Sequence, residues 1–308
     1  LLHPSSELSF VELVILAVAV FAYGMFSEQL TLSPVTAPMV FTTVGLVVGA
    51  GALGIFDVGV EGETTRILIE VTLALVLFTD AIRIDLGRLR RESWFPIRLL
   101  GIGLPLSFLL GFALAALVFP DLLPAEAALL GAALAPTDAA LGQAVVSDRR
   151  LPARLRQGLN VESGLNDGIA LPLVTVALAV SVAEEGTSGF EGWQRFAAEQ
   201  VGFGVLVGVM VGAAGGLLLH RRVATGRVEG LYRQLATVAV LVAAYSGAVV
   251  VGGNGFIASF CAGLAFGQVA RGERATAQDF TEDEGELLTA VTFVIFGAVL
   301  VGPRLGDL

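Results

Sequence analysis

The sequence predicts an all-α, polytopic membrane protein, and three observations support this fold class. Hydrophobic residues make up 55% of the 308 and charged residues 15%, with a mean hydropathy of +0.82. Soluble domains carry about 25% charged residues. Apolar segments of about 17–25 residues, long enough to cross a bilayer, recur along the whole chain. The sign of the charge also alternates from one connecting loop to the next. We therefore expect residues 1–308 to form a single transmembrane domain in a lipid bilayer.

Ten apolar segments are candidate transmembrane spans. The first lacks the basic start and the small-residue cleavage site of a signal peptide, so we count it as a span. In chain order, the spans are expected at residues 8–26, 35–56, 66–84, 97–119, 125–147, 157–182, 198–219, 231–251, 253–270 and 285–303.

Arginine is concentrated in the loops after the odd-numbered spans, whereas the loops after the even-numbered spans are acidic. Only Arg66, Arg195 and Arg304 depart from this distribution. Because arginine-rich loops stay in the cytoplasm, we expect the odd-numbered loops to be cytoplasmic and the N-terminus to lie outside. The expected location is a prokaryotic plasma (inner) membrane.

The acidic run Asp279–Glu286 is expected to form a cytoplasmic loop and the start of a helix. A net charge of −10 without a basic stripe excludes nucleic acid as a partner.

The seventh span carries a glycine at every fourth position, at Gly204, Gly208, Gly212 and Gly216. These glycines share one helix face, so another backbone is able to approach closely. We favour packing within one subunit, with a subunit interface as the alternative. Gly45 and Gly49 repeat the spacing once.

Cysteine and histidine offer little chemistry in this chain. Cys261 is the single cysteine, which excludes a disulfide framework. His3 and His220 lie far apart in sequence, which argues against a histidine metal site. A pH-sensing role for His220 has little support in the sequence, and no cofactor is expected.

The fifth span contains a proline near its middle, in the run Ala135-Pro136-Thr137-Asp138. Proline removes an N–H and clashes with the preceding turn, so Pro136 should kink or break the helix. Ala135, which precedes the proline, is expected to be extended. A broken helix at membrane depth lines a cavity and frees carbonyl oxygens. Asp138 would be favoured at the start of the second half-helix by the helix dipole; the alternative is a simple kink that Asp138 caps.

The sixth span begins with a polar cluster in Asn160–Gly168. Helical periodicity pairs Ser163 with Asp167, and Glu162 with Asn166, on neighbouring faces. We expect Asn166 to bond the broken backbone of the fifth span and Glu162 to pair with an arginine. The alternative is a cytoplasmic helix cap. It is disfavoured because Asp167 would lie roughly 17 Å along a helix from the loop arginine Arg156, about half a bilayer deep.

Two carboxylates, a hydroxyl and a freed carbonyl would make an oxygen-rich site for a hard cation. A carboxylate in a low-dielectric site also holds a proton more tightly than in water. A cation arriving at Asp167 would then expel that proton, so the two ions compete for one group. This competition is sufficient for antiport, and the sequence has no phosphate-binding motif of an ATPase.

At these residues the chain resembles the NhaP/NHE-type sodium/proton antiporters of the monovalent cation:proton antiporter superfamily. The resemblance is carried by A-P-T-D at Ala135–Asp138 and E-S-G-L-N-D at Glu162–Asp167, by their spacing and by their positions in successive spans. It follows the span order through the whole chain and includes the run Phe293–Leu300 in the tenth span. The resemblance implies thirteen helices in two inverted repeats, with a core bundle that moves against a dimerisation scaffold. The expected first repeat covers about 8–182, the linker helix about 198–219 and a partial second repeat about 231–303.

The resemblance also implies a role for each matching residue. Asp167 would bind the cation and the proton, with Ser163 and Asp138 contributing and Thr137 offering its backbone carbonyl. Together these four would hold Na⁺. Asn166 would be the asparagine that accompanies electroneutral one-for-one exchange, and Glu162 would pair with an arginine on a later helix.

The chain departs from the family pattern in two places. Where many relatives have Leu-Phe-Glu in the third span, this chain has Leu77-Phe78-Thr79-Asp80, so Asp80 either replaces that glutamate one position on or the extra carboxylate is lost. Ten spans stand where thirteen are expected, which implies a C-terminal truncation that removes the arginine partner of Glu162. We therefore expect residues 1–308 alone not to transport.

The function expected from the sequence is exchange of Na⁺, or Li⁺ or K⁺, for H⁺, by a homodimer that is not an enzyme and that serves pH homeostasis. The alternatives are a K⁺/H⁺ antiporter, a cation channel of similar architecture, and a membrane scaffold or sensor without transport. An intramembrane aspartyl protease is disfavoured because the run Gly164–Asp167 reads G-L-N-D, not G-x-G-D.

Overall fold

Apolar segments in lipid become helices because a helix bonds its own backbone N–H and C=O groups. The structure, a computed structural model, describes residues 10–31, 35–49, 51–55, 63–84, 86–87, 98–136, 150–152 and 190–305, and single positions between 159 and 181. The elements formed by these residues are all helical, which confirms the predicted fold class.

The described helices follow the predicted spans in order. Five described helical stretches are long and apolar enough to cross a membrane: Phe10–Leu30, Leu99–Val118, Ala198–Ala224, Gly230–Val250 and Arg274–Arg304. Within the sixth predicted span, the described positions are helical. The elements are α1 (Phe10–Thr31), α2 (Ala37–Val48), α3 (Glu63–Arg83), the π-helical turn η1 (Leu99–Gly103), α6 (Leu104–Val118), α7 (Pro124–Leu134), α10 (Phe190–Ala224), α11 (Gly230–Val250), α12 (Gly255–Val269), α13 (Arg274–Ile295), the π-helical turn η2 (Phe296–Val301) and the 3-10 turn η3 (Gly302–Arg304).

Several described helix ends differ from the hydropathy prediction. α2 ends at Val48, well before residue 56. α10 begins at Phe190 because its polar first turns continue the helix, with Arg195 and Glu199 joined at 2.7 Å across one turn. α13 begins at Arg274 and contains the acidic run Asp279–Glu286, which we had assigned in part to a loop. Glutamate forms helix readily, so a helix continues where an apolar segment stops.

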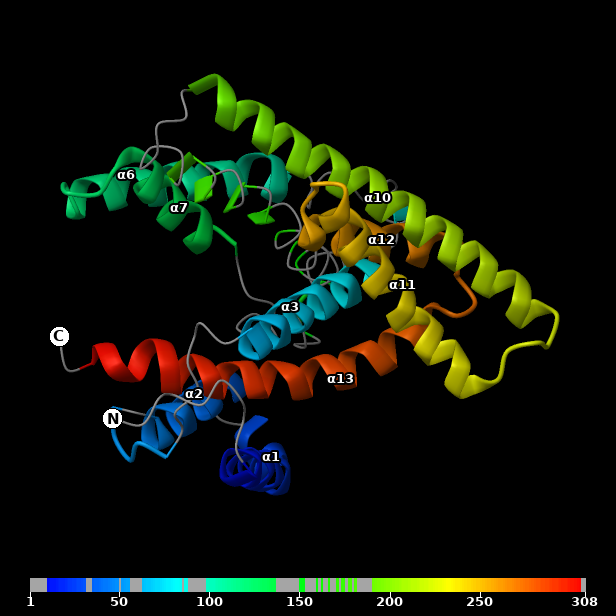
Figure 1. The fold of residues 1–308 in the computed structure, drawn as a ribbon, viewed down its shortest axis with the longest axis horizontal. Helices are drawn as coiled ribbons and strands as arrows, with labels where there is room; N and C mark the ends of the chain where they lie inside the picture. The colour runs from blue at the N-terminus through cyan, green and yellow to red at the C-terminus, as the bar shows by residue number, and fades with distance from the viewer. Residues whose placement is uncertain are drawn as a thin grey trace. The chain divides into compact units, whose positions relative to one another are not determined.

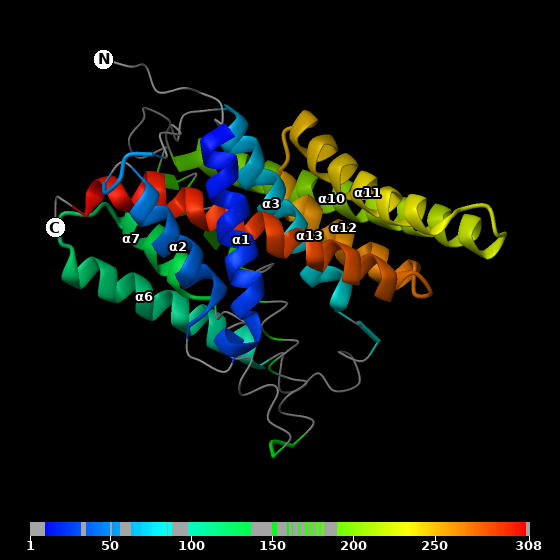
Figure 2. The ribbon, with the colours of Figure 1, turned by 90° about the horizontal axis from the view of Figure 1, so that it is seen from below.

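Residues Leu1–Val76 and Thr281–Leu308 form one compact unit. Within it, α2 runs along the C-terminal part of α13 and η2 (Figures 1 and 2). Gly45 and Gly49 allow this approach, because a Cβ atom at Gly49 would lie 2.6 Å from the Cα atom of Ala298. The core also holds Phe41, whose ring centroid lies 5.1 Å from that of Tyr23.

Residues Leu77–Phe280 form the second unit, in which α10, α11 and α12 pack together (Figure 1). The glycines of α10 follow the small residues of α12 turn by turn. A Cβ atom at Gly208 would lie 2.8 Å from the Cα atom of Ala258, and one at Gly212 would lie 2.6 Å from that of Ala262. The glycine spacing therefore serves helix packing within one subunit, as we favoured from the sequence.

The opposite face of α12 packs against the end of α3. Gly263 and Gly267 bring the α12 backbone against the carbonyl groups of Phe78 and Ile82. The rings of Phe78 and Phe266, both fully buried, pack with centroids 6.0 Å apart. α12 thus lies between two close backbone contacts, one on each face.

Asn254 fixes the start of α12. Its side-chain oxygen accepts hydrogen bonds from the N–H groups of Phe256 and Ile257, at 2.9 and 3.0 Å, which caps the helix. Its own backbone N–H donates to the carbonyl of Gln200 on α10, at 2.9 Å. The same residue therefore begins α12 and ties it to α10.

Candidate functional site

Half of the predicted site residues lie outside the described residues. Thr137, Asp138, Ser163 and Asp167, the four that would hold the cation, belong to this group. Their convergence on one ion therefore stays a prediction. Pro136, Glu162, Asn166 and Asp80 are described, and they show the surroundings in which that prediction stands.

The helix of the fifth span ends where the proline predicts. α7 begins at Pro124, where the Glu126 carboxylate accepts the N–H of Leu123 at 2.8 Å, and it stops at Leu134. Pro136 lies directly after this end and is half-buried. We had expected Ala135 to be extended, and this prediction is wrong. Ala135 keeps helical angles of φ −73° and ψ −39°. Ala135 is the C-cap residue of α7, so the described helix ends two residues before the proline while Ala135 still keeps helical angles.

The two supporting residues of the sixth span differ in burial. Glu162 is half-buried, and Asn166 is completely buried, with none of its surface exposed. A helix cap at the membrane surface would leave Asn166 in contact with water, so its burial argues against that alternative. An amide side chain withdrawn from water needs hydrogen-bonding partners to be stable. The role of Asn166 in bonding the broken backbone of the fifth span therefore stays a prediction.

Asp80 lies on the part of α3 that packs against α12. Its side chain is 24% exposed, and its Oδ1 lies 3.9 Å from Nη1 of Arg83, one turn further along the helix. The preceding residue, Thr79, is buried. The carbonyl contacts of Phe78 and Ile82 with the glycines of α12 hold this end of α3 in place. Asp80 therefore stands on a well-supported helix, whatever its role.

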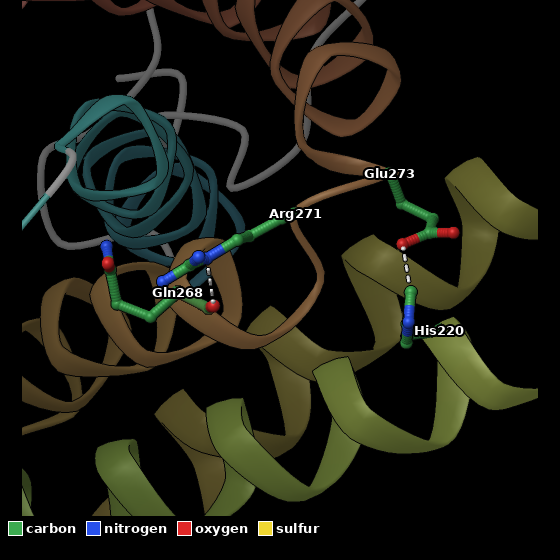
Figure 3. Close-up of polar contacts among 4 residues, drawn as sticks. All are labelled: His220, Gln268, Arg271 and Glu273. Atoms are coloured by element: carbon green, nitrogen blue, oxygen red, sulfur yellow. Dashed lines mark hydrogen bonds and ion pairs between the residues drawn. The ribbon is translucent and has the colours of Figure 1, made fainter. Parts of the chain in front are cut away.

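Sequence reasoning did not find a polar cluster around the turn between α12 and α13 (Figure 3). Nδ1 of His220 on α10 lies 3.1 Å from Oε2 of Glu273, and the Glu273 side chain is only 6% exposed. Nε2 of Gln268 donates to the carbonyl of Ile84 at 2.7 Å, and a guanidinium N–H of Arg274 donates to the carbonyl of Arg83. These partners are between 53 and 191 positions apart. No local sequence pattern marks contacts over such separations.

The described residues also form an apolar cavity of about 300 Å³ between α6, α7 and the sixth span. Only apolar residues line it, among them Phe108 and Phe112 of α6, Ala125 and Ala128 of α7, and Leu173. With no oxygen ligands among these side chains, the cavity is unsuited to a hard cation. In the described part of the chain, no three His, Cys, Asp or Glu side chains gather as metal ligands.

Comparisons with known proteins identify what this chain is similar to. Residues 15–305 match the family model described as "Sodium/hydrogen exchanger, transmembrane". The chain is 29% identical over 242 residues to a K(+)/H(+) antiporter NhaP2 of Shewanella oneidensis, a match that covers 77% of this chain and 40% of the relative. It is 34% identical over 146 residues to Na(+)/H(+) antiporter 2 of Zygosaccharomyces rouxii, covering 46% of this chain and 18% of that protein. The chain thus spans less than half the length of these curated relatives.

A solved structure shares the fold. The sodium proton antiporter MjNhaP1 from Methanocaldococcus jannaschii, solved at pH 8, superposes with a TM-score of 0.67 at 20% sequence identity. The likeness covers 94% of this chain and 69% of that one.

Proposed function

Because the chain belongs to the transmembrane sodium/hydrogen exchanger family, we propose that it exchanges a monovalent cation for a proton across a membrane. The family match over residues 15–305 carries this proposal, since that range contains both polar motifs and all but the first of the predicted spans in full. The apolar helices make the chain an integral membrane protein. No cofactor is required for the exchange.

Asp167 is the proposed exchanging group. Its carboxylate binds either the cation or the proton, with Ser163, Asp138 and the carbonyl of Thr137 completing the cation site. The cation stabilises the ionised carboxylate and so releases the proton. Pro136 supports this arrangement, because it ends the helix of the fifth span and frees backbone groups at that point. The complete burial of Asn166 on the neighbouring span supports its role in holding the frame.

Na⁺ is the cation that we propose first, and K⁺ is the second candidate. K⁺ is favoured by the name of the Shewanella relative, a K(+)/H(+) antiporter, whereas the yeast relative is named for Na⁺. An asparagine at position 166, directly before Asp167, favours an electroneutral exchange of one cation for one proton. The protein would act as a homodimer in a prokaryotic plasma membrane, with its N-terminus outside and its arginine-rich loops in the cytoplasm.

Everted membrane vesicles that contain the full-length protein test this proposal. Addition of Na⁺ should dissipate a preformed pH gradient, and parallel additions of Li⁺ and K⁺ give the order of selectivity. Asp167→Asn should abolish the response, because an amide neither releases a proton nor balances a cation charge. Asn160→Asp, at the cytoplasmic edge of the same motif, is the matched control and should retain exchange.

A flat response to all three cations would refute exchange. Unchanged activity of Asp167→Asn would refute the proposed site and favour a scaffold or sensor. Cation flux that proceeds without proton movement would identify a channel.

A further inference from the structure

Glu273 is a buried carboxylate with one side-chain partner among the described residues. It lies in the turn between α12 and α13 with 6% of its side chain exposed, and the imidazole of His220 is 3.1 Å away. Withdrawing a charged carboxylate from water costs several kcal/mol unless a partner compensates it. The imidazole of His220 is therefore the group placed to compensate the Glu273 carboxylate.

His220, in contrast to Glu273, is partly exposed. Its side chain is 47% exposed and projects from the last turns of α10, beyond the most apolar part of that helix. Histidine is the side chain whose charge ordinarily changes near neutral pH. The pair thus combines a partly exposed imidazole with a buried carboxylate that it contacts directly.

The turn that holds Glu273 also holds the end of α3. Gln268, five residues before Glu273, donates to the carbonyl of Ile84 at 2.7 Å, and Arg274 donates to the carbonyl of Arg83. Arg271, in the same turn, donates to the carbonyl of Gln268 at 3.2 Å. These bonds satisfy carbonyl groups that the end of a helix leaves open. A displacement of the turn would therefore be transmitted to α3.

Other charged groups on the surrounding elements are engaged, exposed or, in the case of Arg233, half-buried. Arg271 and Arg274 bond backbone carbonyls, and Asp80 lies 3.9 Å from Arg83 on α3. Arg221 and Arg222 follow His220 on α10 and are exposed, and the charged residue in the first turn of α11 is Arg233. Within the described residues, His220 is thus the basic side chain that contacts the Glu273 carboxylate.

We propose that His220 and Glu273 form a proton-responsive clamp that positions the end of α3, and with it Asp80, from the far side of α12. When His220 takes up a proton, the charge-assisted bond to Glu273 strengthens and draws the turn against α10. Gln268 and Arg274 then hold the end of α3 more tightly. When His220 loses the proton, the bond weakens and this end of α3 gains freedom. Both residues are positioning residues, and a change in transport with pH would follow only if the proposed function holds.

A spin label at the end of α3 tests the clamp without measuring transport. Leu86 is exposed just after α3, so Leu86→Cys in a Cys261→Ala background provides a single labelling site in the full-length protein. The nitroxide should be less mobile at about pH 6 than at about pH 8. His220→Gln, Glu273→Gln and Gln268→Leu should each remove this pH dependence. Arg221→Gln, which changes an exposed neighbouring charge, should leave it intact.

A thermal-unfolding cycle on the same proteins keeps the test informative if a variant loses structure. Coupling between His220→Gln and Glu273→Gln should amount to about tenfold in the folded-to-unfolded ratio at about pH 6, and to about threefold or less at about pH 8. The clamp is refuted if the label mobility of His220→Gln still changes with pH as in the parent, or if the coupling is the same at both pH values. Asp167→Asn should lose exchange but keep the change of spin-label mobility with pH. This result would show that the clamp and the exchange site are tested independently.

Discussion

Replacing Gly212 by alanine tests the contact between α10 and α12 with the addition of a single methyl group. The new Cβ atom would lie 2.6 Å from the Cα atom of Ala262 and would also meet the carbonyl of that residue. Carbon atoms in favourable contact lie about 3.5–4.0 Å apart, so the two helices would have to separate by about 1 Å. Because the obstacle is backbone, no change of rotamer relieves it.

The expected cost follows from this geometry. Adding atoms to a well-packed interior typically costs about 1–3 kcal/mol, and a fixed backbone obstacle places Gly212→Ala at about 2–3 kcal/mol. At about 2 °C for each kcal/mol, the midpoint of thermal unfolding should fall by about 5 °C. Intrinsic fluorescence during heating in detergent measures this midpoint.

Gly202→Ala is the matched control on the same helix. A Cβ atom at Gly202 would have nothing within 4 Å, and alanine is a better helix former than glycine by about 1 kcal/mol. This variant should melt at or slightly above the temperature of the parent. Equal melting temperatures for Gly212→Ala and Gly202→Ala would refute the close approach of α10 and α12.

Two further predictions use the same unfolding measurement. Asn254→Ala removes the acceptor of two N–H groups at the start of α12 and should cost about 1–2 kcal/mol, whereas Asn254→Asp keeps an acceptor and should cost less; equal losses would contradict the capping role. Gly49→Ala places a Cβ atom 2.6 Å from the Cα atom of Ala298 and should cost about 2 kcal/mol, while Gly24→Ala, with nothing within 4 Å, should not destabilise; a stable Gly49→Ala would show that α2 and η2 do not pack as described.

Hydropathy predicted the described helices because a membrane imposes one strong rule, that apolar segments become helices. It did not predict their ends, since polar turns such as Asp279–Glu286 continue a helix into water at little cost. Glycine spacing predicted a close approach at Gly208 and Gly212, but not which helix would approach. The partners Ala258 and Ala262 are small residues in a segment rich in small residues, so nothing in the sequence distinguishes them.

The candidate site could be predicted in part because its motifs are local. Pro136 ends a helix by its own chemistry, and the four-residue spacing of Glu162 and Asn166 places them on one face without reference to the rest of the chain. The orientation of Thr137, Asp138, Ser163 and Asp167 toward one ion remains a prediction, as these residues lie outside the described part. Contacts such as His220 with Glu273 depend on how three helices pack, which residue identity alone does not specify.

The order of α10, α11 and α12 along the chain has a consequence for biosynthesis. The glycine face of α10 is closed by α12, and α11 is synthesised between them. When α10 leaves the translocon, the partner for that face does not yet exist, so lipid tails or the insertion machinery must cover the groove. The three helices therefore cannot pack together until the ribosome has translated through Val269. Until then, the glycine face of α10 lacks the helix that covers it.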